Sequence, residues 1–181
     1  KGFDKAIDLL ISLKKKNPKY KLYIPGKRPD EFPNTKTIPE EREYYKNVDK
    51  KIKENNLEDS VIYSGWVKTQ DFLKNIGYTL SLSDKDYPES FHVSPFECMA
   101  SNGIGLSLEW EGIEYIYPEY VICKSIEEIA QKIEDYNNND KKYDEFAKKG
   151  REFTRENYDL PFIWNHILKI LENRGAMHDE K

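Results

Sequence analysis

The feature that most constrains the fold is a regular alternation of short apolar runs with longer, helix-like segments. The runs are rich in branched and aromatic residues, and they span 20–24, 60–64, 78–83, 104–108 and 120–123. The segments between and after them have apolar residues at helical spacing or helix-start signals, and they span 3–17, 40–55, 70–76, 94–101, 111–116, 125–137, 141–157 and 160–173. Alternating strands and helices form βαβ units. The sequence therefore predicts an α/β fold with a doubly wound, mostly parallel sheet that helices cover on both faces.

Local signals support several of these helix starts. Thr69 is placed to cap the segment 70–76, and Ser125 with Glu128 forms a capping-box pattern at the start of 125–137. We expect residues 1–181 to form a single domain, with the last helices, about 141–173, packing on it.

Composition narrows the class of partner. The 34% of charged residues are nearly balanced, with 29 Lys and Arg against 33 Asp and Glu, so the basic excess of a nucleic-acid-binding protein is absent. Cys98 and Cys123 form no CxxC pair, which predicts free, buried thiols and a reducing compartment. With no signal-peptide pattern and no apolar run of about 20 residues, we expect a soluble, cytoplasmic protein. The chain begins at Lys1-Gly2 without a methionine, and we expect it to be a piece of a longer protein.

Two carboxylates flank an apolar, Ser-Pro-containing segment at the place where such a sheet would bind a ligand. Ligands bind at the carboxyl ends of parallel strands, which selects the loop 84–93 after the strand 78–83. Glu89 lies in this loop, and Ser94-Pro95 with Glu97 has the pattern of a helix start. Under one interpretation Glu97 is a capping-box residue and Glu89 a solvated side chain. Under the other, the free amides of the helix start bind a diphosphate, and the two carboxylates bind sugar hydroxyls on either side of it.

The second interpretation agrees with a family resemblance. The stretch Glu89-Ser-Phe-His-Val-Ser-Pro-Phe-Glu97-Cys-Met-Ala resembles the motif of two glutamates separated by seven residues in family 4 glycosyltransferases. Further similar blocks follow in the family's order from Lys1 to about Ile133, namely Lys1-Gly2-Phe3, Leu22-Tyr-Ile-Pro-Gly26, Val61-Ile-Tyr-Ser-Gly65 and Glu111-Gly-Ile-Glu114. The resemblance implies the C-terminal, donor-binding half of a GT-B enzyme, a Rossmann-like domain whose N-terminal, acceptor-binding partner is absent from this sequence.

The resemblance also implies roles at matching positions. Glu89 would contact the transferred sugar as the catalytic residue, Glu97 would hold the ribose hydroxyls, and Lys1 would bind the diphosphate. Two further groups of positions would bind the substrate. Trp66 and Val67 would contact the nucleotide base, and the segment Ser90, Phe91, His92, Val93 and Ser94 would lie beside the phosphates and the sugar.

The sequence departs from the family pattern in three places. His92 stands where the family usually has a glycine, which puts the close backbone approach there in question. The second glycine expected after Gly26 is missing, and Asp84-Lys-Asp-Tyr87 lengthens the loop before Pro88.

Weaker signals each have an ordinary interpretation. Asp84-Lys-Asp86 follows a strand as a metal-binding DxD does, but in a chain with 33 Asp and Glu residues this pattern arises readily by chance. The tyrosines at 44, 45, 115 and 117 would stack on carbohydrate under one interpretation and serve as partly buried packing residues under the one we prefer.

These observations together predict a hexosyltransferase domain. It would use a UDP- or GDP-type sugar donor, retain the anomeric configuration, and need neither a metal nor another cofactor. The acceptor would be a glycan or a lipid-linked glycan in polysaccharide biosynthesis, with peripheral association at the inner face of the membrane. The isolated fragment would be inactive. Two alternatives stay open: a non-catalytic nucleotide-sugar-binding or scaffolding module, and a GT-B-related sugar epimerase.

Overall fold

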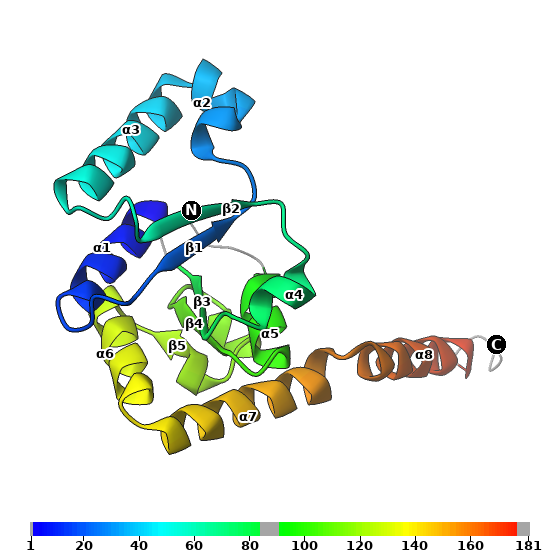
Figure 1. The fold of residues 1–181 in the computed structure, drawn as a ribbon. Coiled ribbons are helices and arrows are strands. Elements are labelled where there is room, and N and C mark those ends of the chain that lie inside the picture. Colours follow the sequence, from blue (N-terminus) through cyan, green and yellow to red (C-terminus); the bar gives the residue numbers. More distant parts are fainter. Residues whose placement is uncertain (1, 84–90, 177–181) are drawn as a thin grey trace.

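The computed structural model describes residues 2–83 and 91–176, in which strands and helices alternate (Figure 1). The strands of these ranges are β1 (Leu22–Pro25), β2 (Val61–Gly65), β3 (Tyr78–Ser81), β4 (Ile104–Leu108) and β5 (Ile122–Cys123). The α-helices are α1 (Phe3–Lys14), α2 (Pro33–Thr37), α3 (Pro39–Glu54), α4 (Thr69–Leu73), α5 (Val93–Ala100), α6 (Ile126–Asn137), α7 (Asp140–Tyr158) and α8 (Leu160–Ala176). Short 3-10 turns occupy Pro29–Glu31, Ile113–Tyr115 and Glu119–Val121. The predicted α/β class is confirmed.

The strands pair in parallel, as predicted, but in two sheets. Within the described ranges the strand orders are β1-β2 and β3-β4-β5. The sequence pattern led us to expect one continuous sheet. Apolar side chains of β1, β3 and α1 line a cavity between the two sheets, so the neighbouring edges of β1 and β3 are not bonded to each other.

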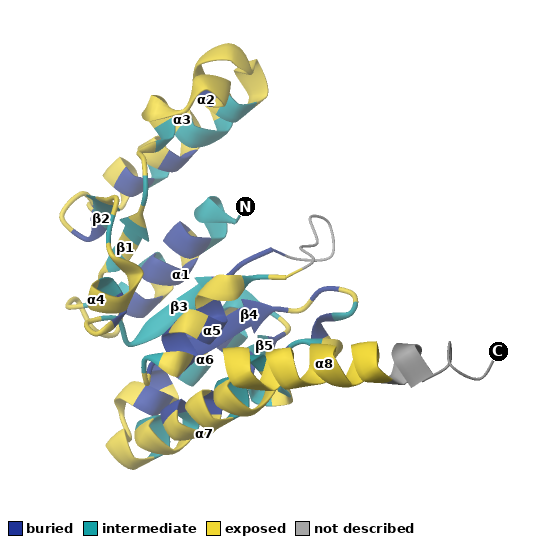
Figure 2. Cartoon of the chain, turned by 90° about the vertical axis from the view of Figure 1, so that its right-hand side faces the viewer, coloured by how far each residue is buried: buried dark blue, intermediate teal, exposed yellow. Residues whose placement is uncertain are grey.

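Helices cover both faces of the sheet β3-β4-β5. Leu106 of β4 is fully buried in a cluster with residues of α1 and α6, whereas the neighbouring Gly105 faces Pro95 of α5. Successive residues of a strand point to opposite faces, so α1 and α6 lie on one side and α5 on the other. Figure 2 shows the buried positions concentrated where these helices meet the strands. Cys98 and Cys123 are buried and free, as predicted.

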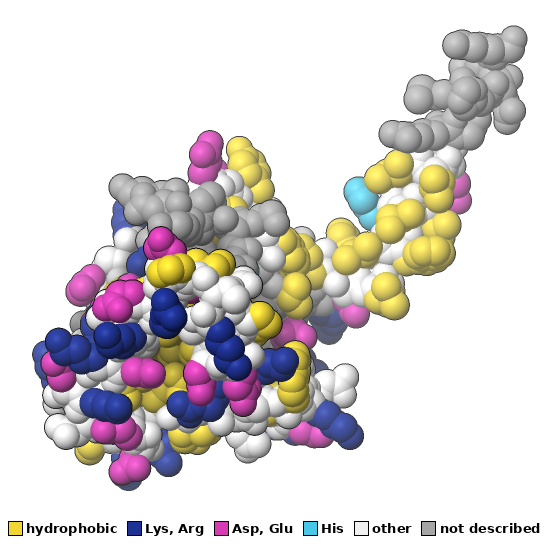
Figure 3. Space-filling view, turned by 90° about the horizontal axis from the view of Figure 1, so that it is seen from above, with side chains coloured by type: hydrophobic (Ala, Val, Ile, Leu, Met, Phe, Trp, Pro, Cys, Tyr) yellow, Lys and Arg dark blue, Asp and Glu magenta, His cyan; other side chains and the backbone are white. Residues whose placement is uncertain are grey.

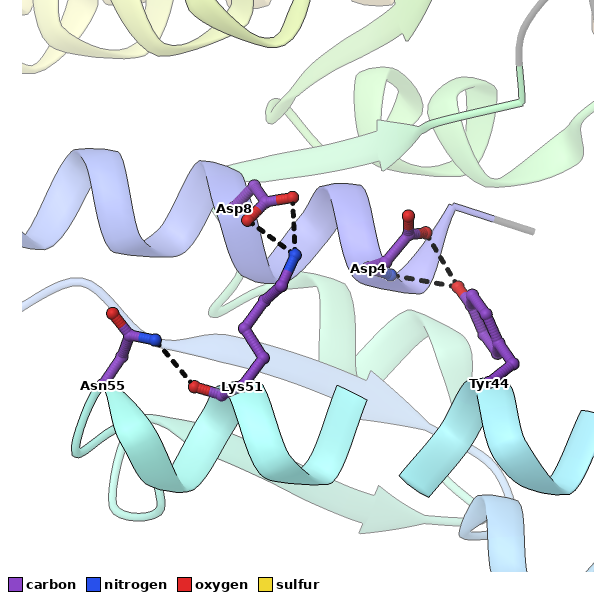
Figure 4. Close-up of polar contacts among 5 residues, drawn as sticks. All are labelled: Asp4, Asp8, Tyr44, Lys51 and Asn55. Carbon is purple, nitrogen blue, oxygen red and sulfur yellow. Dashed lines mark hydrogen bonds and ion pairs between the residues drawn. The ribbon is translucent and has the colours of Figure 1, made fainter. Parts of the chain in front are cut away.

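A pair of polar contacts fastens α3 to α1 (Figure 4). The Tyr44 hydroxyl accepts a hydrogen bond from the backbone N–H of Asp4 at 3.0 Å and donates one to the Asp4 carboxylate at 2.8 Å. One turn further along α1 and about two turns further along α3, the Lys51 ammonium contacts the Asp8 carboxylate at 2.8 Å. The α1–α3 contact also buries Ile7, Leu10, Val48 and Ile52.

Two helix starts differ from expectation in detail. Thr69 does not cap α4: the helix begins at Thr69 itself, and Lys68 precedes it without a side-chain cap. The Ser125 hydroxyl accepts from the Glu128 N–H at 3.2 Å, as predicted. The Glu128 carboxylate, however, accepts from the N–H of Lys124 rather than that of Ser125, at 2.7 Å.

Strand ends also shift. β1 begins at Leu22 rather than at residue 20, and the expected strand 120–123 is a 3-10 turn followed by the two residues of β5.

The last helix does not pack on the domain as expected. α7 lies against α5 and α6, but α8 projects away from the body of the molecule (Figures 1 and 2). Its large apolar side chains are 38–73% exposed, and Figure 3 shows them gathered on the projecting arm. The apolar spacing correctly predicted a helix with an apolar face. The expected packing of that face is wrong, because no element of the described chain covers it.

No helix in the described part of the chain combines the length and apolar character that a membrane crossing requires.

Candidate functional site

The starts of two helices meet at the carboxyl end of β3. Gly2, which precedes α1, has a φ of +70°, and a Cβ there would lie 2.6 Å from the carbonyl oxygen of Leu82. Only glycine combines this left-handed backbone with so close an approach. The first turn of α1 is thereby held directly against the residue that follows β3.

The second of these helices, α5, begins one residue earlier than predicted. Its first residue is Val93, and His92 precedes it in an extended conformation with φ −100° and ψ 118°. Ser94 is therefore not the N-cap, and the helix has no side-chain cap. Pro95 falls in the first turn, where its missing N–H costs no hydrogen bond. It packs so closely on β4 that a Cβ at Gly105 would lie 2.8 Å from the Pro95 Cβ, which explains the glycine.

Three hydrogen bonds tether the start of α5 to its surroundings. The Ser81 hydroxyl at the end of β3 bonds to Nδ1 of His92. The Tyr117 hydroxyl donates to the carbonyl oxygen of His92 at 2.6 Å. The Thr79 hydroxyl donates to the carbonyl oxygen of Ser94 at 3.4 Å, a longer contact. The first turn of α5 is thus held from β3 on one side and from the loop after β4 on the other.

Aromatic packing supports the same turn. The rings of Phe91 and Phe96 are stacked with centroids 5.1 Å apart, and those of Phe96 and Tyr117 with centroids 4.8 Å apart. Tyr117 is 2% exposed, and this burial raises the pKa of its hydroxyl well above its ordinary value. The Tyr117 hydroxyl therefore stays protonated at neutral pH and can donate its hydrogen bond to the carbonyl oxygen of His92.

Glu97 lies in the middle of α5 rather than in its first turn. It is the fifth residue of the helix, so it cannot reach back to cap the helix start, and the capping-box interpretation is wrong. Its side chain is exposed, and it lines the cavity between the two sheets. Within residues 2–83 and 91–176 the Glu97 carboxylate has no hydrogen bond or ion pair. The carboxylate is therefore available to accept hydrogen bonds from a ligand.

The cavity beside Glu97 has a volume of about 850 Å³ and extends along β1 and β3 from their amino ends to their carboxyl ends. Its end at the carboxyl ends of the strands, here called its mouth, is lined by the last residue of β1, by residues that follow β1 and β2, and by residues of α5, namely Pro25, Lys27, Val67, Thr69, Ser94 and Glu97. Deeper, its walls are largely apolar side chains of α1, β1 and β3. A site with an apolar wall, a carboxylate and nearby free helix amides suits a ligand that combines a flat ring, hydroxyl groups and an anion.

The loops after β1 and β2 are joined at the far side of this mouth. The N–H of Gly26 donates to the carbonyl oxygen of Gly65 at 2.6 Å, and both glycines have a positive φ. The next two residues then diverge. Val67 lines the cavity, whereas Trp66 is 84% exposed and lies outside the cavity lining.

The structure brings part of the predicted site together. Val67, Ser94 and Glu97 line one cavity, and Phe91, His92 and Val93 lie beside it at the start of α5. The predicted residues Lys1, Glu89 and Ser90 lie outside the described residues, as does the Asp84-Lys-Asp86 pattern. In the described ranges, no cluster of three or more His, Cys, Asp or Glu side chains could hold a metal ion.

Sequence analysis missed the residues that support α5. Ser81 and Thr79 alternate with apolar residues on β3. This alternation weakly predicts that one face of the strand contacts a polar partner. Tyr117 was expected to be a packing residue, and it is one, but its hydroxyl also holds His92. Tyr115 was expected to be partly buried, yet it is 85% exposed, because it ends the 3-10 turn on the solvent side.

Comparison with known proteins agrees with this geometry. A protein-family model described as glycosyl transferase-like matches residues 7–169. The structure of HepE from Anabaena in complex with UDP superimposes with a TM-score of 0.78 at 18% identity, over 96% of this chain and 45% of that one. HepE has also been solved with UDP-glucose.

Two further structures are similar. The C-terminal domain of the glycosyl transferase group 1 family protein LpcC from Francisella tularensis has a TM-score of 0.69 at 20% identity, over 88% of this chain and 80% of that one. TarM from Staphylococcus aureus in complex with UDP has a TM-score of 0.68 at 23% identity, over 92% of this chain and 32% of that one. Comparison with curated proteins gives no significant match. The fold is a Rossmann-like half of a GT-B architecture, and the chain spans about 45% of the length of HepE.

Proposed function

Because the chain belongs to the glycosyl transferase-like family, we propose that it is the donor-binding half of a hexosyltransferase that uses a nucleoside diphosphate sugar. The observation that carries the proposal is the convergence of the α1 and α5 starts at the end of β3, beside the Glu97 carboxylate, which has no hydrogen bond or ion pair within the described residues. An anion held by the amides of a helix start and a polyol held by a neighbouring carboxylate are the two halves of such a donor.

The diphosphate is assigned to the start of α5. The first N–H groups of a helix have no acceptor within the helix and lie at the positive end of its dipole. Val93 and Ser94 supply these amides, and Lys1 adds a positive charge next to Gly2. With this positive potential in place, the proposed mechanism needs no metal ion to neutralise the departing diphosphate.

The remaining parts of the donor are assigned to neighbouring residues. Glu97 accepts hydrogen bonds from the ribose hydroxyls at the cavity mouth, and Glu89 contacts the transferred sugar. The base packs beside Val67, with Trp66 at its outer edge. UDP is the preferred nucleotide, because HepE and TarM were both solved with UDP.

The proposed reaction retains the anomeric configuration. The bond between the anomeric carbon and the diphosphate oxygen breaks, and the acceptor hydroxyl oxygen bonds to the same carbon from the same face. The acceptor proton passes to the departing diphosphate oxygen, while the helix amides and Lys1 stabilise the developing negative charge. Glu89 orients the sugar throughout this exchange.

The acceptor belongs to the proposal for the whole protein. We assign it to a glycan or lipid-linked glycan in polysaccharide biosynthesis, in the cytoplasm or at the inner face of the membrane, bound mainly by the other half of the enzyme. This chain by itself then binds the donor weakly and transfers nothing.

The backbone conformation of His92 does not argue against a working donor site. A histidine at a position that needed a positive φ would be strained, but the backbone of His92 is extended and suits any residue. The replacement of the family's glycine by His92 therefore causes no backbone strain.

Calorimetric titration of the chain with UDP, GDP and ADP, each with and without EDTA, tests the proposal. We expect metal-independent binding of one nucleotide, preferentially UDP. Glu97→Ala should weaken that binding about 10-fold or more, because it removes a carboxylate that accepts hydrogen bonds from the ribose. The midpoint of urea unfolding should change little, since Glu97 is exposed and does not cap the helix.

Glu58→Ala is the matched control. Glu58 is also an exposed glutamate, but it precedes β2 at the amino end of the strands. The control should bind UDP like the parent chain. Equal affinities for the parent chain and Glu97→Ala would contradict the assigned site, and dependence on a metal ion would contradict the proposed mechanism.

A further inference from the structure

We infer that His92 and Ser81 form a positioning pair that presets the start of α5 for the donor, an inference that rests on the proposed donor site. His92 occupies the place where the resembled family usually has a glycine, so a side chain is available there that a glycine could not supply. The pair acts on the amides of α5 and is not assigned to the chemical step.

The first argument is the direction in which the imidazole is held. Nδ1 of His92 bonds to the Ser81 hydroxyl, so the ring is bound to the last residue of β3. Ser81 is only 3% exposed, and a buried hydroxyl requires a partner. His92 supplies that partner, which ties the residue before α5 to the strand that ends at the site.

The second argument is that His92 is held through its main chain as well. Its carbonyl oxygen accepts the Tyr117 hydroxyl at 2.6 Å, and Tyr117 is itself stacked on Phe96 of α5. A residue fixed at both its ring and its carbonyl group has little freedom in φ and ψ. The N–H groups of Val93 and Ser94, which follow directly, are therefore fixed in direction before any ligand arrives.

The third argument is the rigidity of the supports. Ser81 pairs in register with Ser107 in the sheet, and Pro95 packs on Gly105 of the same neighbouring strand. Backbone N–H groups that already point toward the anion site lose less conformational freedom when the anion binds than N–H groups that must first be ordered. Removing the Ser81–His92 bond should consequently weaken binding of the diphosphate without removing any group that contacts it.

The test compares two substitutions, each of which keeps a polar atom near one of the two ring nitrogens of His92. The side-chain amide of His92→Asn places a polar atom near the position of Nδ1, and that of His92→Gln places one near Nε2. With the pair acting as proposed, His92→Asn retains the UDP affinity of the parent chain. His92→Gln and Ser81→Ala each lose about 3- to 10-fold, the fold-change that corresponds to one net hydrogen bond. Ser107→Ala, a buried serine on the paired strand, is the control and should bind UDP normally.

Thermal unfolding of each variant separates positioning from general destabilisation. We expect His92→Gln to unfold no more than about 4 °C below His92→Asn, the shift that the loss of one net hydrogen bond produces at this chain length, so both variants stay folded during the titration and yet differ in UDP affinity. The reverse order of affinities, with Gln active and Asn weak, would overturn the inference and make the ring a direct ligand through Nε2. Unchanged affinity in both Ser81→Ala and His92→Gln would overturn it as well.

A ligand-free measurement keeps this inference distinct from the proposed function. Nuclear magnetic resonance of the chain with 15N-labelled histidine and backbone should show one His92 tautomer in the parent chain. Ser81→Ala should shift the ring nitrogens and the amide signals of Val93 and Ser94, and Ser107→Ala should leave the His92 ring unchanged. If no nucleotide binds the parent chain but these shifts occur, the donor assignment fails and the tether stands. If Ser81→Ala leaves the ring and the amides unchanged, the positioning pair is refuted.

Discussion

At the scale of single residues, the site depends on two backbone conformations with opposite requirements. Gly2 has a positive φ and no room for a Cβ, so no other residue can take its place without strain. His92 is extended, so its position accepts any side chain, and the chain uses one that bonds to β3. A position near a ligand therefore has to be judged by its backbone angles and not only by the residue usual there.

Gly2→Ala should lower the free energy of unfolding by about 2 to 4 kcal/mol, the sum of a left-handed residue with a Cβ and a close contact with Leu82. Urea denaturation measures this loss. Gly65→Ala is the control, because Gly65 has a φ of +63° but open space around its Cβ position, and it should cost only about 1 to 2 kcal/mol. Equal losses in the two variants would show that the contact with Leu82 carries no strain.

At the scale of elements, helix starts are fixed by contacts from other elements. The Tyr44 hydroxyl of α3 bonds both the N–H and the carboxylate of Asp4, in the first turn of α1. Burial, the largest cause, raises the pKa of Tyr44 to about 12, so at neutral pH its hydroxyl is protonated and can donate and accept at once. The contact between Lys51 and Asp8 is more exposed and contributes less.

Tyr44→Phe should lower the free energy of unfolding by about 1 kcal/mol, because it removes both hydrogen bonds and keeps the ring. The midpoint of urea unfolding at pH 7 reports the change. Tyr45→Phe provides the comparison: Tyr45 is adjacent and its hydroxyl has no hydrogen bond in the described ranges, so we expect a change within about 0.5 kcal/mol. A loss in Tyr45→Phe as large as in Tyr44→Phe would count against the α1–α3 contact as the cause.

At the scale of the whole molecule, the apolar residues divide between a core and a projecting arm. The core lies where α1, α5 and α6 meet the strands, whereas the apolar face of α8 is exposed (Figures 2 and 3). Leucines at the two places have the same side chain and opposite surroundings. Their contributions to stability should differ accordingly.

Leu106→Ala should lower the free energy of unfolding by about 2 to 5 kcal/mol, because Leu106 is fully buried in β4 and its truncation leaves a cavity. Leu171→Ala should change it by less than about 0.5 kcal/mol, since Leu171 is 60% exposed on α8. Chemical denaturation of the two variants side by side makes the comparison. A large loss in Leu171→Ala would mean that α8 folds back on the domain in solution.

The sequence by itself determined the class of fold and the order of its elements. Periodicity reports which faces of an element are apolar, and that information is local. It also selected the loop 84–93 and the glutamate pair as a candidate site, because parallel strands bind ligands at their carboxyl ends. Glu89 lies outside the described residues, so its role stays a prediction. The capping-box pattern at Ser125 is also local. Its hydrogen bond from the Glu128 N–H to the Ser125 hydroxyl is confirmed.

Only the tertiary structure decided how those elements meet. Ser94 has the local chemistry of a cap, yet α5 begins at Val93, because Ser81 and Tyr117 hold His92 from distant parts of the chain. The cavity between β1 and β3 and the exposure of α8 depend on packing between elements that are far apart in sequence. Hydrogen bonds and contacts of this kind leave no periodic trace along the chain, so the pattern of the sequence could predict the elements but not their tethers.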